Sequence, residues 1–255
     1  MRSHQKTVRE EFTRQSAAYS RELKKAAPPA VDYARFAEVE SGHRVLDVGA
    51  GTGFLALALA RQARNTFALD LTEAMLSRAR ENAAEHGIAA IRCLIGEAER
   101  LPFRPETFDR VCCQLSLHHF SSAESPLKEM ARVARRKGKV LVSDITTSED
   151  PRKAVLHNRI EKLRDPSHAW MFPKSEILRL CEGAGLHVEK IEEWEVERTF
   201  TGWFSVTAHN PSGEEVRDLL RESIPGDGAG LSVREEKGEL RFTHSWLALL
   251  LAPRS

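Results

Sequence analysis

A doubly wound α/β fold, with helices on both faces of a mostly parallel sheet, is the fold class that this sequence predicts. Three observations support it. Short apolar runs alternate with segments of helical periodicity between residues 43 and 145, one of these runs ends in a glycine-rich turn, and the next ends in an aspartate. Strands that alternate with helices favour a parallel sheet, because each parallel pair needs a crossover connection.

Each element of this alternation has a local signal. Strands are expected at residues 43–49, 66–71, 91–98, 108–117, 139–145, 186–196 and 245–252. Helices are expected at residues 8–25, 30–39, 54–63, 72–87, 125–138, 151–164, 174–183 and 213–223. Thr72 is expected to cap its helix and Gly87 to end it. Residues 231–242 alternate around a turn, which predicts a hairpin.

Composition narrows the class of protein. The 255 residues are 41% hydrophobic and 29% charged, with 38 Lys and Arg against 37 Asp and Glu. This balance gives no overall basic or acidic field, so it does not favour nucleic acid or an anionic membrane as partner. The charged start "MRSHQKTVREEF" lacks a signal-peptide core, and "WLALLLA" is too short to span a bilayer. The four cysteines lack C-x-x-C spacing and indicate reduced thiols in a cytoplasmic protein.

The most informative stretch is "VLDVGAGTGF", in which a strand leads through Gly49, Gly51 and Gly53 into a helix. Glycine there lets the backbone approach a ligand closely at the carboxyl end of the sheet. Phe54 stands where a dinucleotide-binding turn would have its closing glycine, and Asp47 would repel a pyrophosphate. A cationic ligand therefore suits this turn better than a dinucleotide.

The second expected strand ends in Asp70, at the spacing of an acid that binds a ribose diol. The alternative role for Asp70 is a charge at a helix N-terminus. Because Thr72 already occupies the cap position, the ribose role is preferred.

With these features, the chain resembles the class I S-adenosylmethionine-dependent methyltransferases, and in particular their type 11 subgroup, which includes the ubiquinone/menaquinone C-methyltransferases. The resemblance lies in "VLDVGAGTG", "ALDLTEAMLSRAR", "GEAERLPF", "FDRVCCQLSLHHF" and "PLKEMARVARRKGKVLVSD", in the family's order over residues 45–144. It implies a Rossmann-like sheet of seven strands, the last one antiparallel, with a lid insertion before the final strand. Residues 1–40 would form an N-terminal helical lid and residues 41–255 the methyltransferase domain, with substrate-lid insertions at about 146–174 and 197–243.

The cofactor that the resemblance implies is S-adenosyl-L-methionine. The matching positions place Asp47, Gly49, Ala50, Gly51 and Gly53 at its methionyl end, Asp70 at the ribose, Leu71, Met75, Glu97 and Ala98 at the adenine, and Gln114 and Leu115 alongside. The family commonly has Asp where Glu97 stands. Tyr19 resembles a residue that covers the methionyl group, with ordinary helix packing as its alternative role.

Two adjacent histidines, His118 and His119, follow the fourth strand in "CQLSLHHF". Neighbouring residues of a strand point to opposite faces, so the pair does not suit one metal ion. The other histidines show no H-E-x-x-H or comparable spacing, and we predict no metal. One of the two, His119 by the resemblance, is expected to face the substrate as a base or orienting group. The alternative is that both are structural.

The acceptor is expected to be a small apolar or aromatic molecule. The walls of its site are expected to include Trp170, Phe172, Trp203 and Phe204, although each could instead pack a lid onto the sheet. "QLSL" replaces the Asn/Asp-Pro-Pro-aromatic motif of nucleobase and amide methyltransferases, which argues against those substrates. A non-catalytic S-adenosylmethionine-binding module and a nicotinamide-dependent oxidoreductase are the competing functions. The sequence does not fix the oligomeric state.

Overall fold

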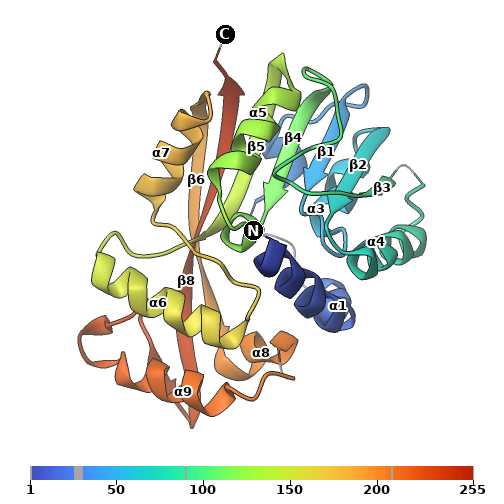
Figure 1. Cartoon of the computed structure of the whole chain (residues 1–255). Coiled ribbons are helices and arrows are strands. Elements are labelled where there is room, and N and C mark those ends of the chain that lie inside the picture. The colour runs from blue at the N-terminus through green and yellow to red at the C-terminus, as the bar shows by residue number, and fades with distance from the viewer. Residues whose placement is uncertain (1, 26–30, 90, 208, 255) are drawn as a thin grey trace.

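A central sheet organises the molecule (Figure 1). The computed structural model describes residues 2–25, 31–89, 91–207 and 209–254. The strands are β1 Arg44–Val48, β2 Asn65–Asp70, β3 Ile91–Ile95, β4 Phe108–Gln114, β5 Ala134–Thr146, β6 Leu186–Thr199, β7 Arg234–Glu236 and β8 Glu239–Pro253. Their order is β3-β2-β1-β4-β5-β8-β6, and β7 pairs with β8. Strands β1 to β5 pair in parallel, whereas β8 is antiparallel to both β5 and β6. The expected fold class is confirmed, with β7 as a short additional strand.

Helices cover the sheet and extend beyond it. They are α1 Arg2–Lys25, α2 Tyr33–Phe36, α3 Phe54–Ala60, α4 Glu73–Glu85, α5 Glu124–Val133, α6 Pro151–Arg164, α7 Lys174–Gly183, α8 Phe200–Phe204 and α9 Gly213–Glu222, with the 3₁₀ segments η1 Leu117–His119, η2 Ser205–Thr207 and η3 Pro225–Asp227. The bounds of α6 and α7 agree with the sequence prediction. The Asp150 carboxylate caps α6 by accepting from the Arg152 N–H, and Pro151 takes the first helical position. None of the helices in the described ranges is long and apolar enough to cross a membrane.

Several expected elements have different lengths in the structure. The first helix is continuous from Arg2, and α2 is a single turn rather than a helix over residues 30–39. The helix expected to reach residue 138 ends at Val133, because Ala134 already pairs with Phe108 of β4. The last strand starts at Glu239 rather than Ser245, because the predicted hairpin runs directly into it.

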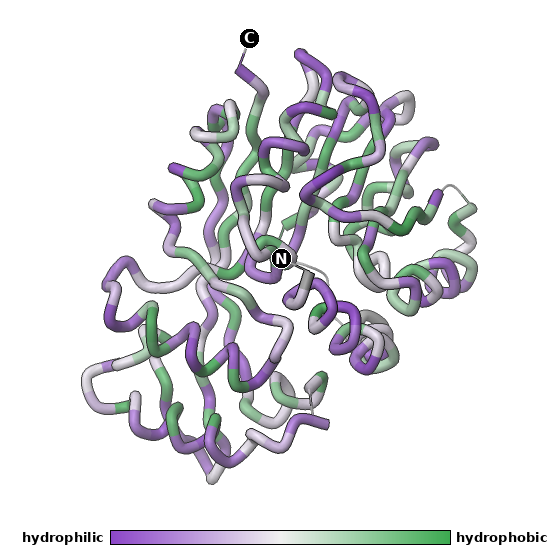
Figure 2. The backbone as a smooth tube through the Cα atoms, in the orientation of Figure 1, coloured by the Kyte–Doolittle hydropathy of each residue, from purple (hydrophilic) through white to green (hydrophobic). Residues whose placement is uncertain are grey.

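Two apolar clusters pack the opposite faces of the sheet, and a third lies apart from them. Cys112 and Cys113 belong to different clusters, as expected for neighbours on a strand. The third cluster gathers α6, α8, α9 and the hairpin around buried residues such as Ile160, Leu220 and Phe242. Figure 1 shows these elements together where β6 and β8 extend past the rest of the sheet, and Figure 2 shows the interior strands as mostly hydrophobic. The segments expected to form lids therefore have a core of their own.

Helix α1 lies between this outlying part and α4 (Figure 1). It contacts α4 on one side and η2 on the other. The Glu11 carboxylate lies 2.9 Å from Nε2 of His209, just after η2. Ser20 of the same helix donates to the side chain of Asn82 on α4. Helix α1 thus bridges the two parts of the molecule over the carboxyl ends of the strands.

Candidate active site

A cavity of about 600 Å³ opens at the carboxyl ends of β1, β2 and β4, beneath α1. Its walls include twelve of the thirteen residues expected to bind the cofactor: Tyr19, Asp47, Gly49, Ala50, Gly51, Asp70, Leu71, Met75, Glu97, Ala98, Gln114 and Leu115. Gly53 is not on the wall. It starts α3 at φ +89°, and a Cβ there would lie 3.1 Å from that of Ala79, so Gly53 serves close packing of α3 on α4.

The glycine turn brings the backbone against the loop after β4. Gly49 has φ +71°, and a Cβ at this position would lie 2.5 Å from Oγ of Ser116. The Ser116 hydroxyl donates to the Gly49 carbonyl at 3.0 Å. The N–H groups of Gly49 and Ala50 both donate to the Leu69 carbonyl of β2. Glycine is required at residue 49 for both backbone conformation and space.

Asp47 presents an unsatisfied carboxylate oxygen on the cavity wall. The residue is only 1% exposed, and its Oδ2 has no hydrogen-bond partner in the described part of the chain. Burial, with a further contribution from Asp70, raises the pKa of Asp47 to about 8. A buried acid in this state gains a partner when a cation binds beside it. The ammonium group of a methionyl moiety fits this requirement.

Asp70 links the glycine turn to the start of α4. One carboxylate oxygen accepts from the Gly51 N–H and the other from the Thr72 N–H, both at 2.8 Å. Burial raises the pKa of Asp70 although these hydrogen bonds oppose the shift. Thr72 occupies the expected cap position, but its side chain makes no capping hydrogen bond. Asp70 therefore also orders the local backbone, a role that sequence reasoning had assigned to Thr72.

The expected adenine end of the cavity is apolar with one acidic residue at its edge. Met75 and Ala98 are buried, Leu71 is half-buried, and Glu97 is exposed. Leu115, directly after β4, has φ +51°, a conformation that a residue with a Cβ rarely adopts. Such strain often accompanies a functional position.

The two adjacent histidines have different environments. Nδ1 of His118 lies 2.6 Å from Oδ1 of Asp144, which also accepts the Ile145 N–H, while Oδ2 accepts the Leu117 N–H. Burial tends to lower the pKa of His118, but the Asp144 carboxylate more than offsets this and raises it. A carboxylate that fixes Nδ1 orients the ring and directs Nε2 toward another partner.

His119 is held by the elements around the cavity. Its Nδ1 lies 3.1 Å from the Ser167 carbonyl, and its ring meets that of Phe12 edge-on at 4.8 Å. Nε2 of His4 on α1 lies 2.9 Å from the His119 carbonyl oxygen. Burial and the neighbouring His118 lower the pKa of His119 to about 4, so its ring is neutral near pH 7. Both rings lie on the cavity wall, but only His118 has a carboxylate partner.

The far side of the cavity is lined by aromatic and apolar side chains. At its end lie the charged and polar side chains of Glu161, Arg164, Arg198 and His244. Trp194 of β6 and Trp246 of β8 stack at 5.6 Å, and Trp203 of α8 also lies on the wall. The Trp246 indole N–H is buried with no hydrogen-bond partner among the described residues. Further lining residues are Ile145, Met171, Val196 and Val206.

Three of the four aromatic residues expected on this side do not line the cavity. Phe172 packs against the main core, Phe204 stacks on Phe200 at 5.4 Å, and Trp170 is 42% exposed. Met171 lines the cavity instead of its two neighbours, because adjacent side chains in a non-helical segment point in different directions. Trp203 is the one member of the expected set on the wall.

Sequence reasoning missed several residues that complete the site. Asp144 is separated from His118 by 26 residues, and Trp194 and Trp246 face each other only through the β6–β8 register. Asp144 ends the apolar stretch "VLVSD", so a polar residue at the end of an apolar strand was the available signal. Nothing local marks Trp194, which lies in a strongly charged strand.

Comparison with known proteins identifies the chemistry of this site. Residues 46–142 match the model of a methyltransferase domain. A protein named uncharacterized methyltransferase YcgJ, from Bacillus subtilis, is 31% identical over 208 residues, which cover 77% of this chain and 82% of YcgJ. Its crystal structure superposes with a TM-score of 0.82 and covers 88% of this chain and 97% of that one, at 27% identity.

A second relative is the ubiquinone/menaquinone biosynthesis C-methyltransferase UbiE of Cupriavidus necator. It is 39% identical over 113 residues, which span 43% of this chain and 46% of UbiE. The matched part of UbiE is thus under half of that protein. Together with the length of the match to YcgJ, these findings show that the chain belongs to the type 11 family of class I S-adenosylmethionine-dependent methyltransferases and uses S-adenosylmethionine.

Proposed function

We propose that this enzyme transfers a methyl group, by in-line displacement, to a small acceptor with an aromatic or apolar body and a nucleophilic atom that must lose a proton. The observation that carries the proposal is a single cavity with two chemically different ends. Asp47, Asp70 and the glycine turn form one end, and the stacked Trp194 and Trp246 lie on the other side. Tryptophan walls favour a flat apolar molecule because they offer large rigid surfaces.

Residues of the sheet's carboxyl edge would hold S-adenosylmethionine, which supplies a methyl group activated on a sulfonium sulfur. Asp47 would pair with the methionyl ammonium group, and Asp70 would use its remaining lone pairs on the ribose hydroxyls. Leu71, Met75 and Ala98 would enclose the adenine, with Glu97 at its edge. Positioning in a dry cavity contributes most to such a reaction, because charge largely disappears during transfer.

His118 is our proposed base. Asp144 fixes its Nδ1, so Nε2 would accept the acceptor's proton as the new bond to the methyl carbon forms. His119, which the resemblance favoured for this role, has a pKa of about 4 and is held by Ser167 and α1. We assign His119 to shaping the cavity rather than to proton transfer.

Helix α1 would act as the lid over the cofactor, consistent with residues 1–40 as a lid and 41–255 as the methyltransferase domain. Phe12 and Tyr19 of this helix line the cavity. Burial raises the pKa of Tyr19 to about 12, so it remains a neutral phenol. The segments within 146–174 and 197–243 would determine the acceptor, because they supply Met171, Trp203 and the polar end of the cavity.

The direct test is a screen of small molecules with methyl-labelled S-adenosylmethionine, read by mass spectrometry. The expected result is label transfer to aromatic or apolar compounds with a hydroxyl, amine or acidic carbon. Trp203→Ala should raise the acceptor KM while the S-adenosylhomocysteine Kd stays unchanged. Cofactor binding without transfer to any compound would favour the non-catalytic binding module. Transfer only to strongly polar acceptors would contradict the aromatic assignment.

A further inference from the structure

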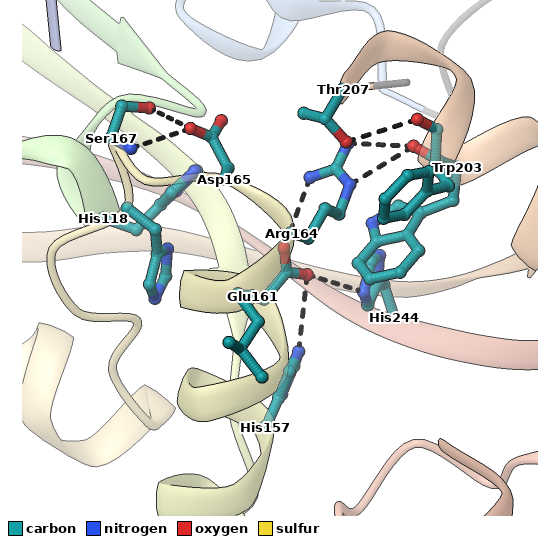
Figure 3. Close-up of polar contacts among 12 residues, drawn as sticks. His118, His157, Glu161, Arg164, Asp165, Ser167, Trp203, Thr207 and His244 are labelled. Atoms are coloured by element: carbon teal, nitrogen blue, oxygen red, sulfur yellow. Dashed lines mark hydrogen bonds and ion pairs between the residues drawn. The ribbon is translucent and has the colours of Figure 1, made fainter. Parts of the chain in front are cut away.

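Three buried side chains meet where α6 faces β8, at the acceptor end of the cavity. His157 and Glu161 lie four residues apart on α6 and share one face of the helix, and His244 extends from β8. Nε2 of His244 lies 3.3 Å from Oε1 of Glu161, and Nε2 of His157 lies 3.8 Å from the same oxygen. Figure 3 shows both rings directed at the Glu161 carboxylate.

Ordinary hydrogen bonding does not account for this arrangement. The 3.8 Å contact is too long for a hydrogen bond, and none of the four ring nitrogens of His157 and His244 has a hydrogen-bond partner in the described residues. Both residues are only 1% exposed. Buried polar groups nearly always have partners, and a cluster without them calls for an explanation, of which a bound water or a bound ion is one.

The spacing of the three ligand atoms suits a metal ion better. Bonds of about 2.1 Å in a tetrahedral site place ligand atoms about 3.4 Å apart, between the two observed separations. All three ligand atoms lie within 4.8 Å of one another. Imidazole rings rotate readily about their last side-chain bond, and a movement of about 1.4 Å in total would bring the two most distant ligand atoms to this separation.

We propose that His157, Glu161 and His244 bind one divalent transition metal ion of the Zn²⁺ type, with its open coordination position facing the acceptor cavity. Two imidazoles and one carboxylate form a ligand set of Zn²⁺ and other first-row ions, whereas Mg²⁺ and Ca²⁺ prefer oxygen ligands. Glu161 and His244 line the cavity and His157 lies behind them, so the fourth position points inward.

Arg164 is the positioning residue of this site. Its Nη1 lies 3.3 Å from the other Glu161 oxygen, while its Nη2 donates to the Trp203 carbonyl at 2.9 Å. It thereby directs Oε1 toward the two histidines, as groups around metal ligands commonly do. The positive charge of Arg164 also repels the metal ion, so we expect a micromolar rather than a picomolar Kd for the metal.

The role of the ion toward the acceptor rests on the proposed function, but its binding does not. An oxygen of the acceptor would take the open position, which would hold the molecule by its polar end. The spacing rules applied to the sequence predicted no metal, because a His-x₃-Glu pair with a third ligand 83 residues beyond Glu161 forms no local motif.

The test is calorimetric titration of the chelator-stripped full chain with Zn²⁺, and absorption spectroscopy with Co²⁺. The wild-type protein should bind one Zn²⁺ per chain at micromolar Kd and give visible Co²⁺ bands of low-coordinate nitrogen and oxygen ligation. His157→Gln should weaken binding at least about 100-fold, beyond the usual effect of changing a group around the ligands. His187→Gln, which alters an exposed histidine of β6, is the matched control and should bind as the wild type does.

S-adenosylhomocysteine titration of every variant separates this proposal from the proposed function. Normal cofactor affinity in His157→Gln would show that the variant is folded and that the lost Zn²⁺ binding is specific. Glu161→Gln provides a second variant if His157→Gln is poorly folded. Equal Zn²⁺ affinity in the wild type and in folded His157→Gln or Glu161→Gln would overturn the metal site and leave methyl transfer untouched.

Discussion

The ionisation of Asp47 should make cofactor binding depend on pH in a way that a single substitution removes. Asp47 has a pKa of about 8 in the ligand-free protein, and the ligand's ammonium group pairs with its ionised form. Affinity should therefore rise as pH rises, because less free energy is spent on removing the proton. With a pKa of about 8, roughly 1% of the carboxyl groups are ionised at pH 6 and roughly a quarter at pH 7.5. The association constant should increase about 20-fold, or about 2 kcal/mol, over this interval.

Calorimetric titration with S-adenosylhomocysteine between pH 6 and pH 7.5 measures this slope. Below pH 7.5 the amino group of the ligand stays protonated. The sulfur of S-adenosylhomocysteine is neutral, so no sulfonium charge contributes to the measured affinity. Asp47→Asn is the matched control, since its side chain has the same shape and does not ionise. Its Kd should be weaker at pH 7.5 and should lose most of the pH dependence. Equal slopes in the wild type and Asp47→Asn would refute the pairing of Asp47 with the ammonium group.

Three further predictions concern other parts of the site. Asp70→Ala should weaken S-adenosylhomocysteine binding by about 1–3 kcal/mol, whereas Asp218→Ala, an exposed change on α9, should leave it unaltered in calorimetry. His118→Asn should lower kcat about 10²–10⁴-fold and leave the cofactor Kd unchanged. Asp144 raises the pKa of His118, so Asp144→Asn should lower that pKa. The acidic limb of the profile of kcat against pH should then move to lower pH in Asp144→Asn. Gly49→Ala should lower the free energy of unfolding, measured with denaturant, by at least about 1–2 kcal/mol through the positive φ alone. Adding Ser116→Gly should recover only the part of the loss that comes from the clash between the new Cβ and the Ser116 side chain.

The cofactor end of the site could be predicted because its signals are local. Asp47 and the three glycines lie within seven residues, and Asp70 ends the next strand. Parallel strands bring their carboxyl ends to one edge, so strand order along the chain was enough to assemble them. The bounds of helices α6 and α7 could be predicted for the same reason. Asp150 and Pro151 mark the start of α6, and Gly183 marks the end of α7.

Local patterns failed where a distant partner decides the structure. The basic run Arg135–Lys137 suits a helix end, but β4 pairs with Ala134 before this run and with Lys139 after it, so the segment belongs to a strand. Trp194 lies among glutamates and lysines, and its position on the cavity wall depends on antiparallel pairing with Trp246. Pairing across 52 residues leaves no periodicity in either segment. Asp144 could not be predicted as the partner of His118 either, because the two residues are far apart in the sequence.

The separation between predictable and unpredictable residues has a structural basis. The cofactor end belongs to the sheet and its two main apolar clusters, whereas α6, α8 and α9 pack around a third cluster. Strands β8 and β6 run through both parts, and they carry Trp246, His244 and Trp194 into the cavity. Substitutions in the third cluster can therefore reshape the acceptor end without disturbing Asp47 or Asp70. We expect acceptor preference to follow the sequence of this outlying part, and cofactor affinity to follow residues 45–115.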